Sequence, residues 1–206
     1  GLYPYAPVPL GHVDPYTLLV AVALSAQTTD KKVNQVTPQL FARAATPEAM
    51  AQLPVTSIRE LIREVGLAPQ KAKALQGLSQ LLIERHGSQV PAERRALEAL
   101  PGVGRKPANV ILNTAFGEPT MAVDTHMFRV ANRTGLAPGK NVLQVEKKLV
   151  KAVPEEYMLH AHHWLILHGR HVCLARKPRC PQCVIRQYCA YRRVFHAIMV
   201  DDRVHL

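Results

Sequence analysis

The stretch L-P-G-V-G-R-K, Leu100–Lys106, decides how the middle of this 206-residue chain is built. Helical patterns run up to it over 93–100 and away from it over 105–116. Its two glycines allow a tight turn and let an external group come close to the backbone. The stretch therefore predicts a hairpin between two helices, with N–H groups available to a phosphate and room for a bridging monovalent cation. The residues expected to contact the phosphate are Gly102, Val103, Gly104 and Arg105.

Lys106 ends this stretch in the first turn of the second helix, where its charge opposes the helix dipole. It is either an exposed lysine that binds phosphate or a nucleophilic amine. Asp124, in V-D-T-H-M-F-R, is the candidate carboxylate. We expect Asp124 to cap the helix that starts at Thr125, and a fixed anion also suits an oxocarbenium-like transition state. Spacing alone does not bring Asp124 to Lys106.

The rest of the chain also reads as short helices, and no sustained alternation of apolar and polar residues predicts a strand. Capping residues and prolines mark the helix starts, among them Asp14-Pro15, Thr46-Pro47, Ser57 and Asn141. The expected fold class is therefore all-α. The expected helices cover 15–27, 30–43, a short segment from 47, 58–65, 69–86, 93–100, 105–116, 125–133, 142–152 and 155–171.

The charge of the chain indicates its partner. The formal net charge is +11 and the pI is about 9.8, which favours a polyanion, most commonly nucleic acid, over a basic protein without such a partner. Hydrophobic residues make up 48%, so a disordered chain is not expected. No apolar run reaches membrane-spanning length and no signal peptide is visible, so we expect an intracellular protein without membrane contact. The first residue is Gly1, as in a processed or trimmed product.

All cysteines of the chain lie in one short segment with the spacing C-x6-C-x2-C-x5-C. Disulfides would suit a small secreted domain, but no secretory signal supports them. Four thiolates can bind structural zinc, although zinc sites usually carry two close C-x2-C pairs and only one is present. An iron–sulfur cluster also takes four thiolates and tolerates uneven spacing, so it ranks first and zinc second. The expected metal ligands are Cys173, Cys180, Cys183 and Cys189.

The segment L-A-R-K-P-R between the first two cysteines carries three basic residues, Arg176, Lys177 and Arg179. A loop anchored by a metal centre can hold such cations in place for phosphate contact, which we favour over a solvated loop without a partner. Several histidines between 160 and 171 lie near Trp164, and their spacing favours packing and cluster surroundings over a second metal site.

The order L-P-G-V-G-R-K, V-D-T-H and C-x6-C-x2-C-x5-C resembles the endonuclease III family of helix–hairpin–helix base-excision DNA glycosylases. The resemblance runs from about Pro15 to Cys189. It implies a two-lobed all-α fold that binds double-stranded DNA in the cleft between the lobes. One lobe would be a helical barrel over 15–118, and the other would join 1–14 to 119–206 and hold a [4Fe-4S] cluster. We expect a monomer of the cytoplasm or nucleoid.

The resemblance also implies a reaction. Lys106 would be the nucleophile and Asp124 the essential carboxylate in removing oxidised pyrimidines, followed by β-elimination at the abasic site. Mismatch-specific relatives generally lack this lysine, so a monofunctional mismatch or damage-specific glycosylase is the alternative, with a non-enzymatic damage-binding protein as a third interpretation. Other implied positions are Gln27, which would fill the gap left by a flipped base, and Leu67, which would wedge into the stack. The implied lesion pocket contains Ser25, Asp30 and His126.

Four departures from the family pattern concern substrate range more than reaction type. Ala68 stands where an aromatic residue is often found in the wedge loop. Pro107 follows the lysine in place of a small residue, although proline suits a first helical turn. The start G-L-Y-P-Y-A-P-V-P-L-G is not helical, and residues 191–206 have no clear counterpart.

Overall fold

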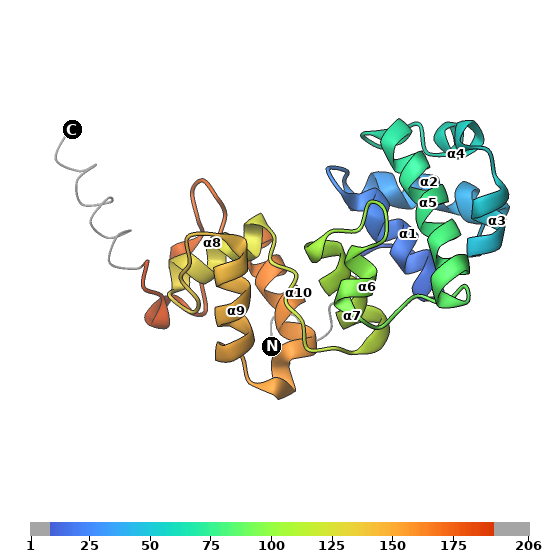
Figure 1. The fold of residues 1–206 in the computed structure, drawn as a ribbon. Helices are drawn as coiled ribbons and strands as arrows, with labels where there is room; N and C mark the ends of the chain where they lie inside the picture. The colour runs from blue at the N-terminus through green and yellow to red at the C-terminus, as the bar shows by residue number, and fades with distance from the viewer. Residues whose placement is uncertain (1–8, 192–206) are drawn as a thin grey trace. The chain divides into compact units, whose positions relative to one another are not determined.

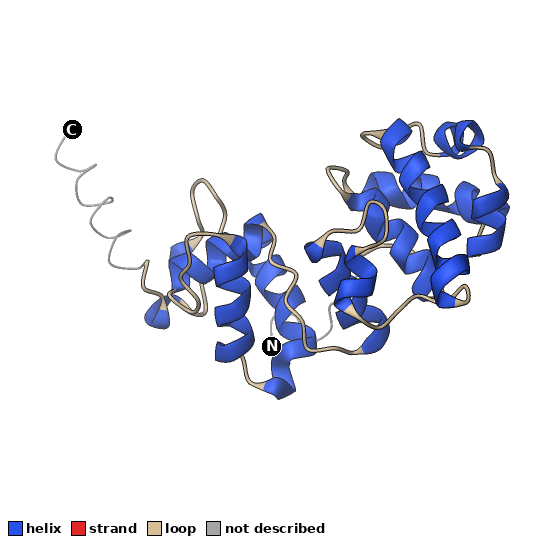
Figure 2. Ribbon diagram, viewed as in Figure 1, coloured by secondary structure: helices blue, strands red, loops and turns tan. Residues whose placement is uncertain are grey.

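The computed structural model describes residues 9–191. Within this range every regular element is an α-helix or a short 3₁₀ helix, and none of the described residues forms a strand (Figure 2). The all-α prediction is thus confirmed. The described residues divide into two compact units, 9–118 and 119–191. The predictions made for residues 1–8 and 192–206 lie outside the described residues.

The helices follow one another closely along the chain, and Figure 1 labels the α-helices. In chain order they are α1 (Pro15–Ser25), α2 (Asp30–Arg43), α3 (Pro47–Gln52), α4 (Val55–Leu61), α5 (Ala68–His86), α6 (Arg94–Glu98), α7 (Arg105–Phe116), α8 (Thr125–Thr134), α9 (Val142–Ala152), α10 (Glu155–His171), η1 (Cys180–Gln182) and η2 (Arg186–Tyr188).

Helix α1 forms the centre of the first unit, because it is apolar on every side and contacts α2, α5 and α7. Each of its residues from Tyr16 to Leu24 is buried. Its start is fixed by a capping box: Asp14 Oδ1 accepts from the Thr17 N–H at 2.7 Å, and Thr17 Oγ1 accepts from the Asp14 N–H at 3.1 Å. A fully buried helix of this kind holds the following elements around one hydrophobic core.

Several predicted helix ends differ from the structure. The predicted Ser57 cap is wrong: α4 begins at Val55 after Pro54 and ends at Leu61. Pro54 explains the earlier start, because its fixed φ suits the edge of a helix. Helix α1 ends at Ser25 instead of Gln27, since Gln27 has a left-handed φ of 54°.

Residues 9–14 pack with the first unit and not with the cysteine-bearing part, where we placed them. Asn34 of α2 holds this segment, since its Nδ2 donates to the Pro9 carbonyl at 2.7 Å and its Oδ1 accepts from the Gly11 N–H at 2.9 Å. Leu10 is buried in the same hydrophobic core as α1. The other edge of the first unit falls between Glu118 and Pro119.

The second unit contains α8, α9 and α10 around a smaller core that includes Met127, Leu149 and Met158. Helices α8 and α10 approach closely at Gly169, where an added Cβ would lie 2.8 Å from the Cβ of His126. Glycine is needed there because any side chain would push the two helices apart. The cysteine segment follows α10 and folds into η1 and η2.

Candidate active site and cysteine loop

The predicted hairpin lies between α6 and α7, and its turn needs only one of its glycines for its own geometry. Gly102 has a φ of 78°, and an added Cβ would lie 3.0 Å from the Ala74 Cβ of α5. Gly104 has an ordinary φ of −95°, and an added Cβ would meet nothing within 4 Å. Neither backbone strain nor packing therefore explains glycine at 104.

The structure contradicts part of the expected phosphate contact. The Val103 N–H donates to the Leu100 carbonyl at 3.1 Å, and the Val103 side chain is buried in the core. Val103 therefore closes the turn and has no N–H to offer a phosphate. The Gly104 N–H, in contrast, has no hydrogen-bond partner within 9–191, and no side chain caps the start of α7. The available N–H groups at the hairpin thus begin at Gly104.

Lys106 lies in the exposed first turn of α7, one residue after Arg105. Its amine has no hydrogen-bond or ion-pair partner in the described part of the chain. Arg105 faces Glu98 of α6 at 3.9 Å. Pro107 lies in the first helical turn, where its missing N–H removes no intrahelical bond. The arrangement leaves a lysine amine open to an external group at the positive end of a helix.

Asp124 caps α8, as predicted, with Oδ1 accepting from the Met127 N–H at 2.8 Å. The side chain is half-buried, and its second oxygen has no partner among residues 9–191. His126, a residue of the expected lesion pocket, has Nδ1 3.1 Å from Nη2 of Arg129. One oxygen of Asp124 is therefore fixed by the helix start while the other remains available.

Gln27 and Leu67 occupy two loops of the first unit, and both side chains are exposed. Gln27 follows α1 with a φ of 54°, and Leu67 precedes α5 with a φ of 59°. A Cβ built on Gly66 would lie 3.3 Å from the Gln27 carbonyl oxygen, so the two loops lie against each other. Of the other expected pocket residues, Ser25 donates to the Val22 carbonyl at 2.7 Å and Asp30 begins α2.

Left-handed backbone concentrates at residues predicted to bind DNA. Four described residues other than glycine have a positive φ: Gln27, Leu67, Ser88 and Lys177. Such a conformation costs an ordinary residue about 1–2 kcal/mol. Three of the four are predicted DNA contacts, which is the distribution expected where local strain serves a functional site.

The four cysteines form no disulfide, and they lie in a loop of partly buried residues. Burial, and after it the charges of Cys173, Cys183 and Cys189, raise the pKa of Cys180. Burial likewise raises the pKa of Cys183. A cationic centre would offset both effects and stabilise the thiolates. No three His, Cys, Asp or Glu side chains within 9–191 converge as ligands of a single metal ion, so the fit to a cluster rests on this set of four thiols.

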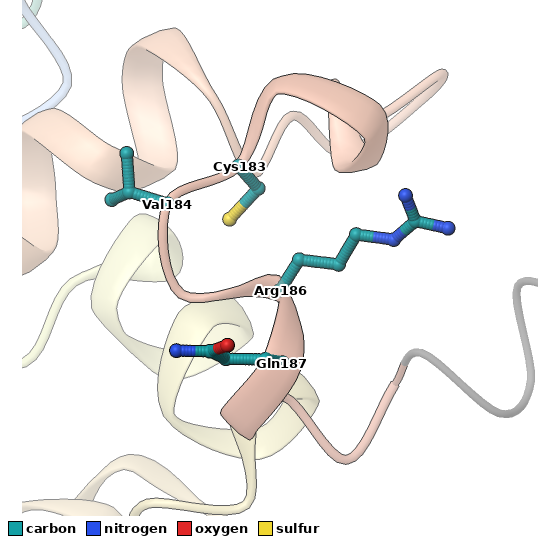
Figure 3. Close-up of a pocket in the computed structure, with 4 residues that line it drawn as sticks. All are labelled: Cys183, Val184, Arg186 and Gln187. Carbon is teal, nitrogen blue, oxygen red and sulfur yellow. The ribbon is translucent and has the colours of Figure 1, made fainter.

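Figure 3 shows the hollow beside Cys183, lined also by Val184, Arg186 and Gln187. The Arg186 guanidinium extends away from the Cys183 sulfur in this view. The Cys183 sulfur also lies 3.7 Å from Nε2 of His168, whose pKa is lowered by burial. His168 therefore lies in the predicted surroundings of the cluster.

Two arginines that the sequence analysis missed tie the cysteine loop to α8. Arg129 donates to the carbonyls of Cys173 at 2.9 Å and Gly169 at 2.8 Å. Arg133 donates to the carbonyls of Leu174 at 2.6 Å and Ala175 at 3.0 Å. Their i, i+4 spacing puts both on one face of α8, which could have indicated a shared partner. The helix capped by Asp124 is thereby joined to the cysteine loop.

The basic residues of that loop, Arg176, Lys177 and Arg179, are all exposed, as a phosphate contact requires. The Arg179 N–H donates to the Val172 carbonyl at 2.9 Å, which closes the base of the loop. The histidines of α10 lie as packing predicted: His162 is buried and its Nδ1 accepts from the Ala122 N–H at 3.3 Å, and His160 stacks on Trp164.

Comparison with known proteins gives one match for the part of the chain with the hairpin and another for the cysteine loop. Residues 20–155 match the family described as "HhH-GPD superfamily base excision DNA repair protein". Residues 173–189 match the "Iron-sulfur binding domain of endonuclease III". Endonuclease III of Escherichia coli (strain K12) is 54% identical over 189 residues, which cover 92% of this chain and 90% of that protein.

Solved structures give the same result. A trapped covalent intermediate of endonuclease III with DNA matches with a TM-score of 0.88 and 42% identity, covering 95% of this chain and 92% of that one. A thermostable thymine-DNA glycosylase matches with a TM-score of 0.83 and 27% identity, covering 92% and 89%.

The chain therefore belongs to the endonuclease III family within the HhH-GPD superfamily of base-excision DNA repair proteins. It is a DNA glycosylase with AP lyase activity, it binds DNA, and it carries an iron–sulfur cluster at its cysteine loop. None of the described helices is long and apolar enough to cross a membrane.

Proposed function

We propose that the enzyme removes oxidised pyrimidines from double-stranded DNA in the nucleoid and then cuts the abasic strand, with Lys106 as nucleophile. The observation that carries this assignment is the free Lys106 amine at the uncapped start of α7, two residues after the unoccupied Gly104 N–H. A phosphate held by Gly104, with a monovalent cation at the turn, would place the adjacent sugar near this amine.

The reaction begins when the damaged nucleotide leaves the stack, at a cost of a few kcal/mol that is smallest for a weakened pair. The Lys106 nitrogen forms a bond to C1′, the glycosidic bond breaks, and the base leaves with a proton. The C1′–O4′ bond then breaks as the nitrogen lone pair forms a protonated Schiff base with C1′, and O4′ takes up a proton from solvent. Loss of a C2′ proton and rupture of the C3′–O bond release the 3′ phosphate, which is β-elimination.

Asp124 has two roles in this proposal. Through Oδ1 it fixes the start of α8, and through its unpartnered oxygen it stabilises positive charge at the sugar or takes the Lys106 proton. Gln27 and Leu67 occupy the space that the flipped nucleotide vacates. A [4Fe-4S] cluster on the four cysteines would supply a rigid anchor for the basic loop, so that Arg176, Lys177 and Arg179 meet the phosphates of the strand. We infer that the enzyme works as a monomer.

Borohydride trapping tests the nucleophile. Wild-type protein should form a covalent adduct with a duplex that holds a single oxidised pyrimidine, and Lys106→Gln should form none while still binding the duplex. Trapping by Lys106→Gln would refute the assignment. Asp124→Asn should fold but lose about 10²–10³-fold in single-turnover base release. Loss of base release in both variants would support a requirement for both residues in the reaction.

A mismatched normal base is the second candidate for the excised base, because a thymine-DNA glycosylase shares the fold at 27% identity. Release of thymine from a mismatched duplex, without release of an oxidised pyrimidine, would favour it. A panel of single-lesion duplexes, each assayed for base loss and strand cleavage, separates the two functions and defines the preferred lesion.

A further inference from the structure

The two exposed residues proposed to enter the DNA stack depend on a shared support. Gln27 and Leu67 are both held in left-handed backbone conformations, which neither would adopt at low cost in a free loop. The Gly66 backbone approaches the Gln27 carbonyl so closely that an added Cβ would lie 3.3 Å from it. Some interaction must therefore stabilise the loop after α1 against the start of α5.

Lys71 supplies that interaction. It lies in the first turn of α5, where its N–H donates to the Leu67 carbonyl at 3.0 Å, and the residue is 8% exposed. Its Nζ donates to the carbonyls of Leu24 at 2.8 Å and Ala26 at 2.7 Å, and to Oγ1 of Thr28 at 2.9 Å. All three donors of the ammonium group are used, and two of the acceptors flank Gln27.

Packing alone does not explain a lysine at this position. Burial lowers the pKa of Lys71, and no carboxylate in the described part of the chain pairs with its ammonium group. A Leu or Met side chain would fill the same space without removing a charge from water. The carbonyls at the end of α1 favour a cation, yet a cap for α1 alone needs no bond to Thr28, which lies beyond Gln27.

We propose that Lys71 is a positioning residue, which ties the loop carrying Gln27 to the helix start carrying Leu67 so that both side chains enter the DNA from preset backbones. This inference rests on the proposed roles of Gln27 and Leu67. Holding the two loops before binding reduces the entropy that must be lost when DNA is engaged. The benefit is confined to damaged or extrahelical sites, because an undamaged duplex offers no gap for either side chain.

The test compares Lys71→Met with Lys73→Met, which removes the same charge from an exposed position on the same helix. Affinity is measured for two duplexes, one with a tetrahydrofuran abasic analogue and one undamaged. Lys71→Met should lose about tenfold or more in affinity for the abasic analogue and change by less than about twofold for the undamaged duplex. Lys73→Met should change both affinities equally.

A spectroscopic measurement separates positioning from affinity. With 2-aminopurine opposite the abasic analogue, wild-type protein at saturation should raise its fluorescence as the partner base unstacks. Lys71→Met should give a smaller rise at saturation, which reduced binding alone cannot produce. Leu78→Ala, a core substitution in the same helix, serves as the stability control and should keep the wild-type rise.

Thr28→Val keeps the proposal testable if Lys71→Met does not fold. It removes one acceptor of the Lys71 ammonium group and should cost about threefold in affinity for the abasic analogue. Where Lys71→Met does fold, adding Thr28→Val to it should bring no additional cost. Equal discrimination and equal fluorescence by wild type and Lys71→Met would overturn the role of Lys71. Absence of discrimination in the wild type itself would instead overturn the proposed function, so the two failures are distinguishable.

Discussion

The two units fix their functional groups by different means. In the first unit a large hydrophobic core surrounds α1, and the exposed residues Gln27, Leu67 and Lys106 lie at loop ends and helix starts anchored on that core. In the second unit the core is smaller. There, Arg129 and Arg133 hold backbone carbonyls of the cysteine loop, and this loop carries the iron–sulfur cluster.

The two units differ in the interactions that keep their functional groups in place. Apolar burial stabilises the first unit without a cofactor, and the amine of Lys106 on its surface stays free. The cysteine loop has no comparable burial, since most of its residues are exposed or half-buried. Its geometry must come from the cluster and from charged hydrogen bonds, each worth about 1.5–3 kcal/mol. The stability of the two units should therefore respond differently to loss of the cluster, of an arginine side chain and of a glycine.

Loss of the cluster should produce the largest difference. In Cys189→Ala the visible absorption of the cluster should disappear, and hydrogen exchange over 173–191 should approach the rate of an unfolded peptide because little apolar burial remains there. Exchange in α5 should stay as slow as in the wild type. Equal acceleration in α5 would show that the units do not differ in this way. Iron and sulfide analysis of the purified protein checks the starting material.

Arg133→Met should destabilise the second unit by about 2–4 kcal/mol, because it leaves the carbonyls of Leu174 and Ala175 without their donor. The matched control is Arg179→Met, which removes an exposed cation from the same loop. We expect the control to stay within about 0.5 kcal/mol of wild type in urea unfolding. If both variants unfold at the same urea concentration, the hydrogen bonds of Arg133 contribute nothing to the loop.

Substitution of the two glycines of the hairpin should affect two different properties, the free energy of unfolding and the affinity for DNA. Gly102→Ala should cost about 1–3 kcal/mol, since its φ is 78° and its Cβ would press on Ala74. Gly104→Ala should leave the unfolding free energy within about 0.5 kcal/mol of wild type yet weaken binding of an undamaged duplex. Thermal unfolding and fluorescence anisotropy measure the two effects. Unchanged DNA affinity in Gly104→Ala would remove the argument for phosphate contact there.

A smaller effect is expected from pH in the second unit. Burial, with a contribution from His160, lowers the pKa of His163 below its ordinary value of 6.5. As the pH falls through 6.5 the unfolded chain takes up a proton that the folded chain does not, so the free energy of unfolding falls. That loss stops growing once the pH is below the folded pKa. His163→Gln should unfold with a weaker dependence on pH between 7.5 and 5.0, measured by urea titration at each pH.

The smallest expected effect comes from relieving left-handed backbone. Ser88→Gly, at a turn with no proposed DNA contact, relieves its positive φ but also removes the hydrogen bond from Ser88 Oγ to Glu48. The free energy of unfolding should therefore change by less than about 1 kcal/mol, and DNA binding should stay unchanged. Leu67→Gly relieves the same kind of strain but should weaken affinity for an abasic-site duplex, because the wedge is lost. If Leu67→Gly binds that duplex as well as Ser88→Gly does, Leu67 is not a wedge.

Local signals in the sequence predicted the helices well, since capping acts within a few residues. Asp14, Thr46 and Asn141 cap the helices that they were expected to cap. The failure at Ser57 has the same origin, because a preceding proline also starts a helix and the sequence offers both. The all-α class and the four-cysteine loop followed from such local patterns.

The supports of the site were not predictable in this way, because their partners lie far along the chain. Lys71 bonds to the Leu24 carbonyl 47 residues away, and Arg133 to the Leu174 carbonyl 41 residues away. Lys71 precedes Leu75 by four residues and so lies on the apolar stripe of its helix. The sequence pattern could therefore have indicated that this lysine is buried. The closing bond of Val103 was missed because P-G-V-G alone does not show which N–H groups its turn consumes.

The all-apolar helix α1 has a consequence during synthesis. The helices that cover it, α5 and α7, are made much later, and α7 is complete only at Phe116. At ribosomal speeds of about 5–20 residues per second, α1 waits roughly 5–20 s before its last covering helix emerges. Throughout that interval the apolar segment of α1 lacks its covering helices. The nascent chain is therefore expected to bind chaperones that shield exposed apolar surface.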